Sequence, residues 1–210
     1  MTALLFAKGL LLGLAIAAPL GPIGALCISR TLERGFWAGV AGGLGTALAD
    51  ASYALLAAAG FAVFAGMLSV VSVPLGLAGG LFMIWLGWRG MAPKPATAAA
   101  TVDASRDLLQ TTATTFLLTI ANPATILSFA AIFAGLGLAR TGDAVNAAIV
   151  VAGVFLGSLA WWFFLSGLIA ALHHRLSPTF SVWVARLSGL VLIGFGVAAI
   201  AMGLRHLAAT

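Results

Sequence analysis

The chain has 210 residues, of which 62% are hydrophobic and only 7% are Asp, Glu, Lys or Arg, and its mean hydropathy is +1.16. A soluble domain carries roughly 25% charged residues, so this composition excludes a water-soluble fold and indicates an integral membrane protein. The net charge of +5 does not indicate a nucleic-acid partner, because the cations stand singly at segment ends.

Apolar stretches long enough to cross a bilayer recur along the whole chain. A transmembrane helix needs about 20 mostly apolar residues. The pattern predicts six such spans, at residues 4–29, 36–60, 67–90, 112–137, 145–171 and 182–204. The apolar start of the first span favours a retained helix over a cleaved signal peptide. We therefore expect an all-α integral membrane protein in which residues 1–210 form a single transmembrane domain.

The first span is interrupted near its middle by the sequence APLGP at 18–22. Pro19 and Pro22 remove two backbone donors, and Gly21 permits dihedrals that other residues resist. Freed backbone at membrane depth is tolerated only inside protein or beside a watery cavity. Pro22 would begin a second half-helix whose free amides, near the midplane, could hold a carboxylate. Prolines that only kink a helix for packing are the alternative.

The second span holds Asp50, the one acidic residue in the interior of any predicted span. An ionisable group there costs about 2.5–3.5 kcal/mol on insertion scales, so it should face the bundle interior with a partner. No basic residue lies equally deep. The candidate partners are the amides of the broken helix, Asn122, or a transported cation or proton. Asp50 is thus the candidate proton-coupling residue, and a hydrogen-bonded structural aspartate is the alternative.

The fourth span is interrupted in the same way as the first, at Asn122-Pro123. Asn122 is a good helix N-cap and Pro123 a good first helical residue. The hydroxyls of Thr125 and Ser128 follow within two turns. We therefore expect a second half-helix start, which faces the first one.

The two halves of the chain share a weak internal repeat. Three short echoes fall in matching spans: IAAP at 16–19 with IANP at 120–123, Gly45-Thr46 with Gly157-Ser158, and GLFMIWLG at 80–87 with GLVLIGFG at 189–196. Because each half has three spans, an odd number, the second half must be inserted upside down. Inverted repeats are a transporter architecture. The domain then divides into repeat one (1–91), a cytoplasmic link (92–111) and repeat two (112–210).

Glycines at four-residue spacing predict faces where helices pack closely. They are Gly9 and Gly13, Gly35, Gly39 and Gly43, and Gly153 and Gly157. In the repeat register Trp162 lies opposite Asp50, so Trp161 and Trp162 could line a cavity, although packing is the commoner role of such residues. The single Cys27 excludes an internal disulfide.

Lys and Arg residues are unequally divided between the two sides of the predicted membrane domain. The connections after the first, third and fifth spans hold seven, namely Arg30, Arg34, Arg89, Lys94, Arg106, Arg175 and Arg186. The opposite side holds Lys8, Arg140 and Arg205. Positive charge marks the cytoplasmic side, so both termini should face outward. A first span that is only half inserted would move the N-terminus inside.

Two features of the charged loops allow plain interpretations. Arg30 and Arg34 flank Glu33 in a short loop, which is mainly a topology signal, with a gate ion pair as the alternative. Asp103 and Asp107 in the long link are predicted to be solvated charges.

Motifs of enzymes and pumps are missing from the sequence. It contains no nucleophile elbow, zinc HExxH, P-loop or dinucleotide glycine fingerprint, and its three histidines lack metal-ligand spacing. We therefore expect no enzyme activity, no cofactor and no metal. A channel would need a continuous polar or carbonyl-lined pore, for which the spans offer few polar side chains.

Four segments resemble the amino-acid translocators of the LysE/RhtB type. They are APLGP (18–22), ISRTLERGFWAG (28–39), GLGTALADASY (43–53) and IANPATILSF (120–129), and the resemblance covers nearly the whole chain. It implies an inner-membrane secondary exporter of amino acids or similar metabolites, driven by the proton gradient. Many members read Pro-Gly-Pro without the inserted Leu20, so the binding geometry and substrate could differ here.

The sequence thus predicts a multi-pass exporter of amino acids or related small zwitterions in a bacterial inner membrane, coupled to protons and working by alternating access. An alternative is a secondary transporter or channel for another small solute or ion. Its partners would be the amino acid, protons and lipid, without nucleic acid, and a homodimer is a further option. The expected substrate-binding residues are Pro19, Gly21, Pro22, Gly24, Asn122, Pro123 and Thr125.

Overall fold

The computed structural model describes residues 2–19, 21–59, 61–91, 104–122, 125, 129, 144–172 and 178–209. Every element in these ranges is an α-helix, which confirms the predicted all-α class. The helices are α1 (Thr2–Ala17), α2 (Pro22–Arg34), α3 (Phe36–Ala59), α4 (Phe61–Met91), α5 (Ala104–Ile120), α7 (Ala144–Leu172) and α8 (Pro178–Ala209).

Several of these helices can cross a bilayer. Three described segments are long and apolar enough, namely Phe36–Ala58, Ala144–Leu172 and Val182–Arg205, and the bent pair of α1 and α2 passes the same test together. Large apolar side chains point outward from them, as lipid-facing residues do. The chain is therefore a multi-pass membrane protein. Six spans remain a prediction, because 67–90 and 112–137 include side chains outside the described set.

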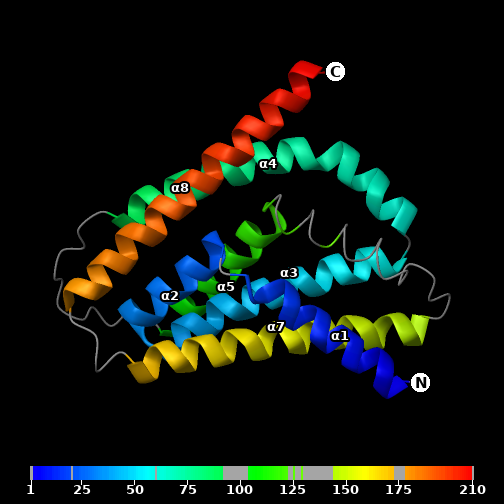
Figure 1. Ribbon diagram of the computed structural model, residues 1–210, viewed down its shortest axis with the longest axis horizontal. Helices are drawn as coiled ribbons and strands as arrows, with labels where there is room; N and C mark the ends of the chain where they lie inside the picture. Colours follow the sequence, from blue (N-terminus) through cyan, green and yellow to red (C-terminus); the bar gives the residue numbers. More distant parts are fainter. Residues whose placement is uncertain are drawn as a thin grey trace.

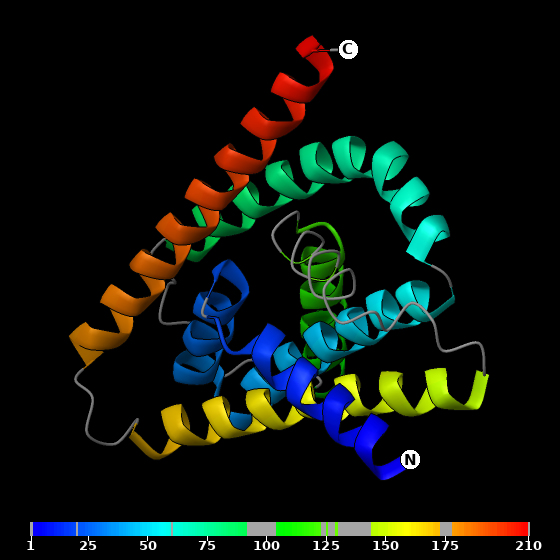
Figure 2. The ribbon, with the colours of Figure 1, turned by 45° about the vertical axis from the view of Figure 1, so that its right-hand side comes forward.

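The long helices run in alternating directions across the molecule. In Figure 1, α3 and α8 begin at the left end, whereas α4 and α7 begin at the right end, and both chain termini lie toward the right. The α1–α2 pair runs from right to left. Figure 2 shows α2 and α5 between the α4–α8 pair and the group formed by α1, α3 and α7. This central layer brings the broken helices into the interior.

Close backbone contact joins α1 to α7, as the glycine spacing predicts. A Cβ atom on Gly9 would lie 2.5 Å from the Val150 carbonyl oxygen, and one on Gly153 would lie 2.6 Å from the Phe6 carbonyl oxygen. Only glycine allows two helices to approach this closely. The prediction is wrong for Gly35, which has a φ of +88°, no atom near a Cβ position, and serves as the C-cap of α2.

Glycines also join α4 to α8, in two reciprocal contacts. A Cβ on Gly80 would lie 2.7 Å from the Gly196 carbonyl oxygen, and one on Gly196 would lie 2.6 Å from that of Gly80. Gly87 and Gly189 approach each other in the same way, at 2.5 and 2.7 Å. In the sequence echo Gly80 corresponds to Gly189 and Gly87 to Gly196. If each residue is replaced by its counterpart in the other half, the contact between Gly80 and Gly196 becomes the contact between Gly189 and Gly87.

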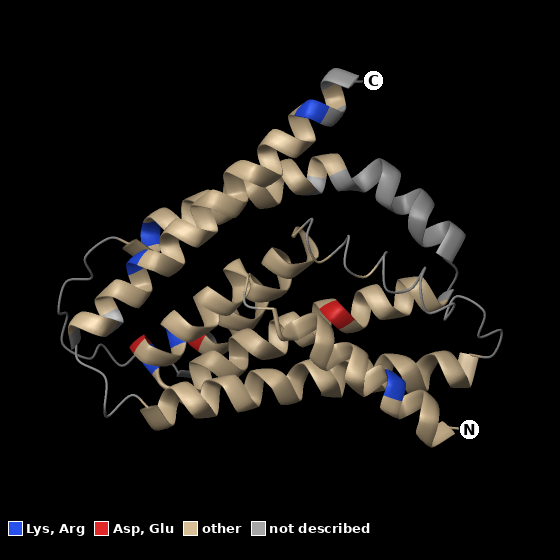
Figure 3. Ribbon diagram, in the orientation of Figure 1, with Lys and Arg blue, Asp and Glu red and all other residues tan. Residues whose placement is uncertain are grey.

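Charged residues gather at one end of the molecule, where α2 and α4 end and α8 begins (Figure 3). There the Arg34 guanidinium donates to the Asp107 carboxylate at 2.7 Å, and that of Arg30 donates to the Thr111 carbonyl oxygen at 3.2 Å. Both arginines belong to α2 rather than to a loop. The Asp107 side chain is 32% exposed, which fits the prediction of a solvated charge, and it also pairs with Arg34 because α5 begins at Ala104. Asp103 lies outside the described residues.

Candidate functional site

The first predicted break lies where the sequence places it. α1 ends at Ala17, α2 begins at Pro22, and the two helix axes meet at 81°. Gly21 occupies the N-cap position and offers no side chain to cap the first turn. The amides of Ile23 and Gly24 therefore have no partner within the helix, and both residues are buried.

The second break follows the end of α5 at Ile120. Ala121 forms a turn, Asn122 is buried and non-helical, and Thr125 and Phe129 are helical. The Tyr53 hydroxyl, from α3, donates to the Ile120 carbonyl oxygen and so satisfies an acceptor that the helix end leaves free. Pro123 and Ser128 lie outside the described residues.

Both breaks meet at one pocket with a volume of about 60 Å³. One water needs roughly 10–15 Å³ of such space, so the pocket has room for a small polar group. It is lined by Ile16, Ala17, Pro19, Gly21, Pro22, Ile23, Gly24, Thr46, Asp50, Thr119, Asn122, Thr125 and Trp162. The structure therefore brings together every predicted site residue except Pro123, which is outside the described residues. Their roles in binding and proton coupling stay predictions.

Asp50 is fully buried in this pocket and only half satisfied. Its side chain is 1% exposed, and its Oδ2 accepts a hydrogen bond of 2.7 Å from the Ser158 hydroxyl of α7. Its Oδ1 has no hydrogen-bond partner among the described residues. Ser158 is not among the partners that the sequence suggested for Asp50. The signal was available, since Gly157-Ser158 is the echo of Gly45-Thr46.

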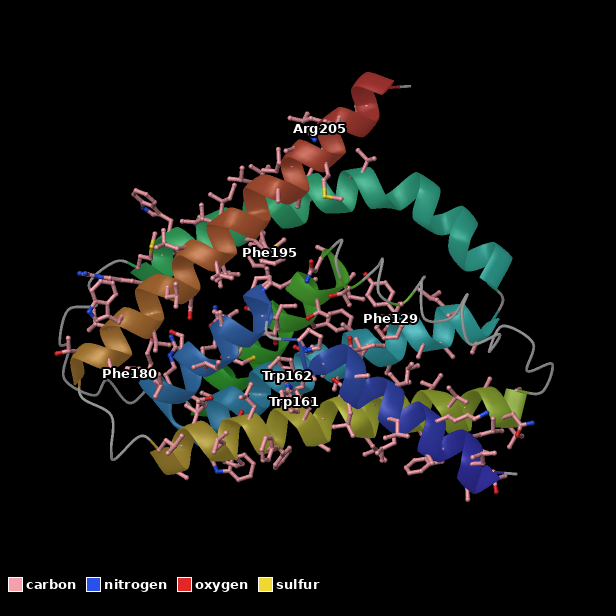
Figure 4. The ribbon with its side chains drawn as sticks, viewed as in Figure 1. Phe129, Trp161, Trp162, Phe180, Phe195 and Arg205 are labelled. Atoms are coloured by element: carbon pink, nitrogen blue, oxygen red, sulfur yellow. The ribbon has the colours of Figure 1, made fainter. Side chains whose placement is uncertain are left out.

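Trp162 forms part of the pocket wall, whereas Trp161 is not among the lining residues. Figure 4 labels both side chains near the middle of the molecule, on α7. Gly43 of α3 makes room for the Trp162 side chain, because a Cβ at Gly43 would overlap that of Trp162. Of the two tryptophans that the sequence allowed as cavity residues, the structure therefore places one at the pocket.

Two hydroxyl residues at the pocket were missed by the sequence analysis. Thr46 lies one turn before Asp50, and Thr119 lies in the last turn of α5. Each donates a hydrogen bond to a carbonyl oxygen one turn earlier in its own helix. The Thr46 hydroxyl donates to the Gly42 carbonyl at 3.3 Å, and the Thr119 hydroxyl donates to the Thr115 carbonyl at 2.8 Å. Their oxygens remain acceptors at the pocket. Threonines are common in membrane helices, so neither carried a distinctive sequence signal.

Comparison with known proteins gives a consistent family assignment. A family model described as LysE type translocator matches residues 14–203. The Bacillus subtilis (strain 168) protein named "Putative amino acid efflux protein YcgF" is 28% identical over 203 residues, which are 91% of this chain and 93% of that protein. "Chemotactic transduction protein ChpE" of Pseudomonas aeruginosa is 28% identical over 175 residues, 82% of this chain and 86% of its own. No solved structure matches the chain.

Proposed function

The chain belongs to the LysE type translocator family, and from this premise we propose that it exports amino acids or related small zwitterions across a bacterial inner membrane. In this proposal, protons drive export and the two repeats alternate access around the pocket. The observation that carries the proposal is the meeting of both helix breaks with the buried Asp50 at one pocket.

The chemistry of the pocket suits a molecule with both an anionic and a cationic group. The first amides of α2, which have no partner within the helix, can donate hydrogen bonds, and the positive end of the helix dipole lies with them. The Oδ1 atom of Asp50, unpartnered among the described residues, can accept one. A substrate carboxylate would rest near Ile23 and Gly24, with Asn122 and Thr125 adding hydrogen bonds. The substrate ammonium, or a proton, would go to Asp50.

The arrangement of the helices supports alternating access between inverted repeats. α3 runs opposite to α7, and α4 runs opposite to α8, as Figure 1 shows. These are the pairs that the sequence echoes equate. The reciprocal glycine contacts between α4 and α8 have the form that a two-fold relation between the halves requires. Two inverted halves around a midplane site are the architecture of many secondary transporters.

The charge distribution supports a cytoplasmic position for the ends of α2 and α4 and the start of α8. Basic residues gather there, and basic residues are retained on the cytoplasmic side of membranes. Both termini lie toward the opposite end and would face the periplasm. Export would then carry the substrate from the charged end, through the pocket, to the end that holds the termini.

Transport by the purified protein in liposomes tests this function. We expect an imposed pH gradient to drive movement of a few radiolabelled amino acids from a pool of the standard twenty. Asp50→Asn should abolish the gradient-dependent part. Asp107→Asn is the matched control, since it makes the same chemical change far from the pocket.

Two results would contradict parts of the proposal. A folded, correctly oriented protein that moves no amino acid would exclude amino-acid export. Gradient-driven export by Asp50→Asn at the wild-type rate would exclude a coupling role for Asp50.

A further inference from the structure

The pocket contains a buried hydrogen-bond donor that the proposed function leaves unassigned. The Trp162 side chain is 3% exposed and lines the pocket, yet its indole nitrogen has no hydrogen-bond partner among the described residues. An indole N–H can only donate, and a buried tryptophan usually finds an acceptor. An acceptor carried into the pocket by a ligand would satisfy it.

The fold fixes this donor in place before any ligand arrives. Gly43 leaves the space that the Trp162 side chain fills. The ring also belongs to a buried cluster with Ala17, at the end of α1, and with Ile23 and Cys27 of α2. Trp162 is therefore held against both sides of the first helix break. A preorganised donor loses little conformational freedom on binding, so its hydrogen bond contributes more to affinity.

The unpartnered groups in the pocket are of opposite kinds. Trp162 on α7 offers a donor, and the Oδ1 atom of Asp50 on α3 offers an acceptor, each without a partner among the residues that the structure describes. The amides of Ile23 and Gly24, which have no partner within α2, add further donors. A carboxylate is complementary to the donors and an ammonium to the acceptor. One α-amino acid supplies both groups.

We propose that the Trp162 indole N–H donates a hydrogen bond to the carboxylate of the transported molecule. This contact makes Trp162 a specificity-determining residue, which selects amino acids over the corresponding amines that lack the carboxylate. The inference rests on the proposed function, because it assigns a substrate contact within the same pocket. Trp161 provides the internal comparison: its indole nitrogen is also buried and unpartnered among the described residues, but it does not line the pocket.

Nuclear magnetic resonance of the tryptophan side chains tests the contact without requiring transport. The full-length chain, labelled with ¹⁵N in detergent micelles, gives one indole signal for each of its six tryptophans. Trp162→Phe and Trp161→Phe assign the two relevant signals. The probes are the standard amino acids, together with methylamine and ethylamine, which are glycine and alanine without the carboxylate. We expect amino acids to shift the Trp162 signal and leave Trp161 in place, and the amines to shift neither.

Affinities of the two tryptophan variants for the same probes test the contact a second time. Trp162→Phe keeps an aromatic ring against Gly43. It removes the donor together with part of the ring volume, and the lost volume should affect both kinds of probe alike. A hydrogen bond to a charged group corresponds to a loss of about 10- to 100-fold in affinity for the amino acid. The affinity for the corresponding amine, which lacks the carboxylate, should change by less than about threefold, and Trp161→Phe should change neither affinity.

The outcomes separate this inference from the proposed function. A Trp162 signal that no amino acid shifts, or that methylamine and ethylamine shift equally, would overturn the inference even if the liposomes export amino acids. A Trp162 signal that responds to amino acids in a protein that never exports them would overturn the proposed function and leave the contact standing.

Discussion

At the scale of single residues, the hydrogen bond from Ser158 to Asp50 links two parts of the site that lie far apart in the sequence. The two residues are 108 positions apart in the sequence, and Ser158 is completely buried. Because this is the one hydrogen bond to the Asp50 carboxylate among the described residues, it fixes the direction in which the free Oδ1 atom points. Ser158 is thus a positioning residue for the proposed coupling group.

Replacing Ser158 with alanine should impair coupled export without unfolding the protein. Loss of one buried hydrogen bond corresponds to about a 3- to 10-fold lower rate of gradient-driven export. Ser166→Ala is the control, because Ser166 is an equally buried serine on α7 that does not line the pocket. Liposome assays at several imposed pH gradients measure both variants. Equal rates for wild type and Ser158→Ala would show that Asp50 does not need this partner.

A second prediction at this scale concerns the hydroxyl of Tyr53 and the end of α5. Tyr53→Phe keeps the ring contact with Phe129, whose centroid lies 5.4 Å away, but leaves the Ile120 carbonyl without its donor. We expect the free energy of unfolding to fall by about 0.5–1.5 kcal/mol, which should lower the melting temperature in detergent by a few degrees. Ser52→Ala, which removes a hydroxyl bonded only to its own helix, should melt like the wild type. A Tyr53→Phe protein as stable as the wild type would refute the capping role.

At the scale of helices, close glycine contacts hold α1 against α7 in the turns that precede the first break. Gly9→Ala should destabilise the protein, because the new Cβ would lie 2.5 Å from the Val150 backbone oxygen and would force the helices apart. Overpacking of this kind costs about 1–3 kcal/mol. Gly194→Ala on α8 is the control, since no atom lies within 4 Å of its Cβ position. In thermal unfolding, Gly9→Ala should melt at a lower temperature than Gly194→Ala. A Gly9→Ala protein with the wild-type melting temperature would argue against a close-packed interface.

The sequence predicts some of these elements well because their causes are local. Pro19, Gly21 and Pro22 act on their own backbone, so the end of α1 and the start of α2 could be predicted from the chain alone. The partners of charged groups depend instead on tertiary packing. Arg34 and Asp107 are 73 residues apart, and no local pattern joins them. The early start of α5 was missed for a related reason: its polar first turns resemble a loop until α2 supplies their partners.

At the scale of the whole molecule, the direction of the helices leads to a prediction about topology. Both termini lie toward the end opposite the cluster of basic residues (Figures 1 and 3). A reporter enzyme that is active only in the periplasm should therefore be active when fused after Thr210. The same reporter should be inactive when inserted in the link at 92–103. The opposite pattern of activities would show that the termini face the cytoplasm and that the basic end of the molecule faces the periplasm.

Cys27 gives the fold a built-in chemical reporter. It is the only cysteine in the chain, and it is 1% exposed, packed with Ala17, Ile23 and Trp162 beside the first helix break. A thiol reagent can reach its sulfur only when α2 separates from α3 and α7. The speed at which one label attaches therefore measures how often the native protein opens there. No added cysteine or cysteine-free background is needed to follow that opening during turnover.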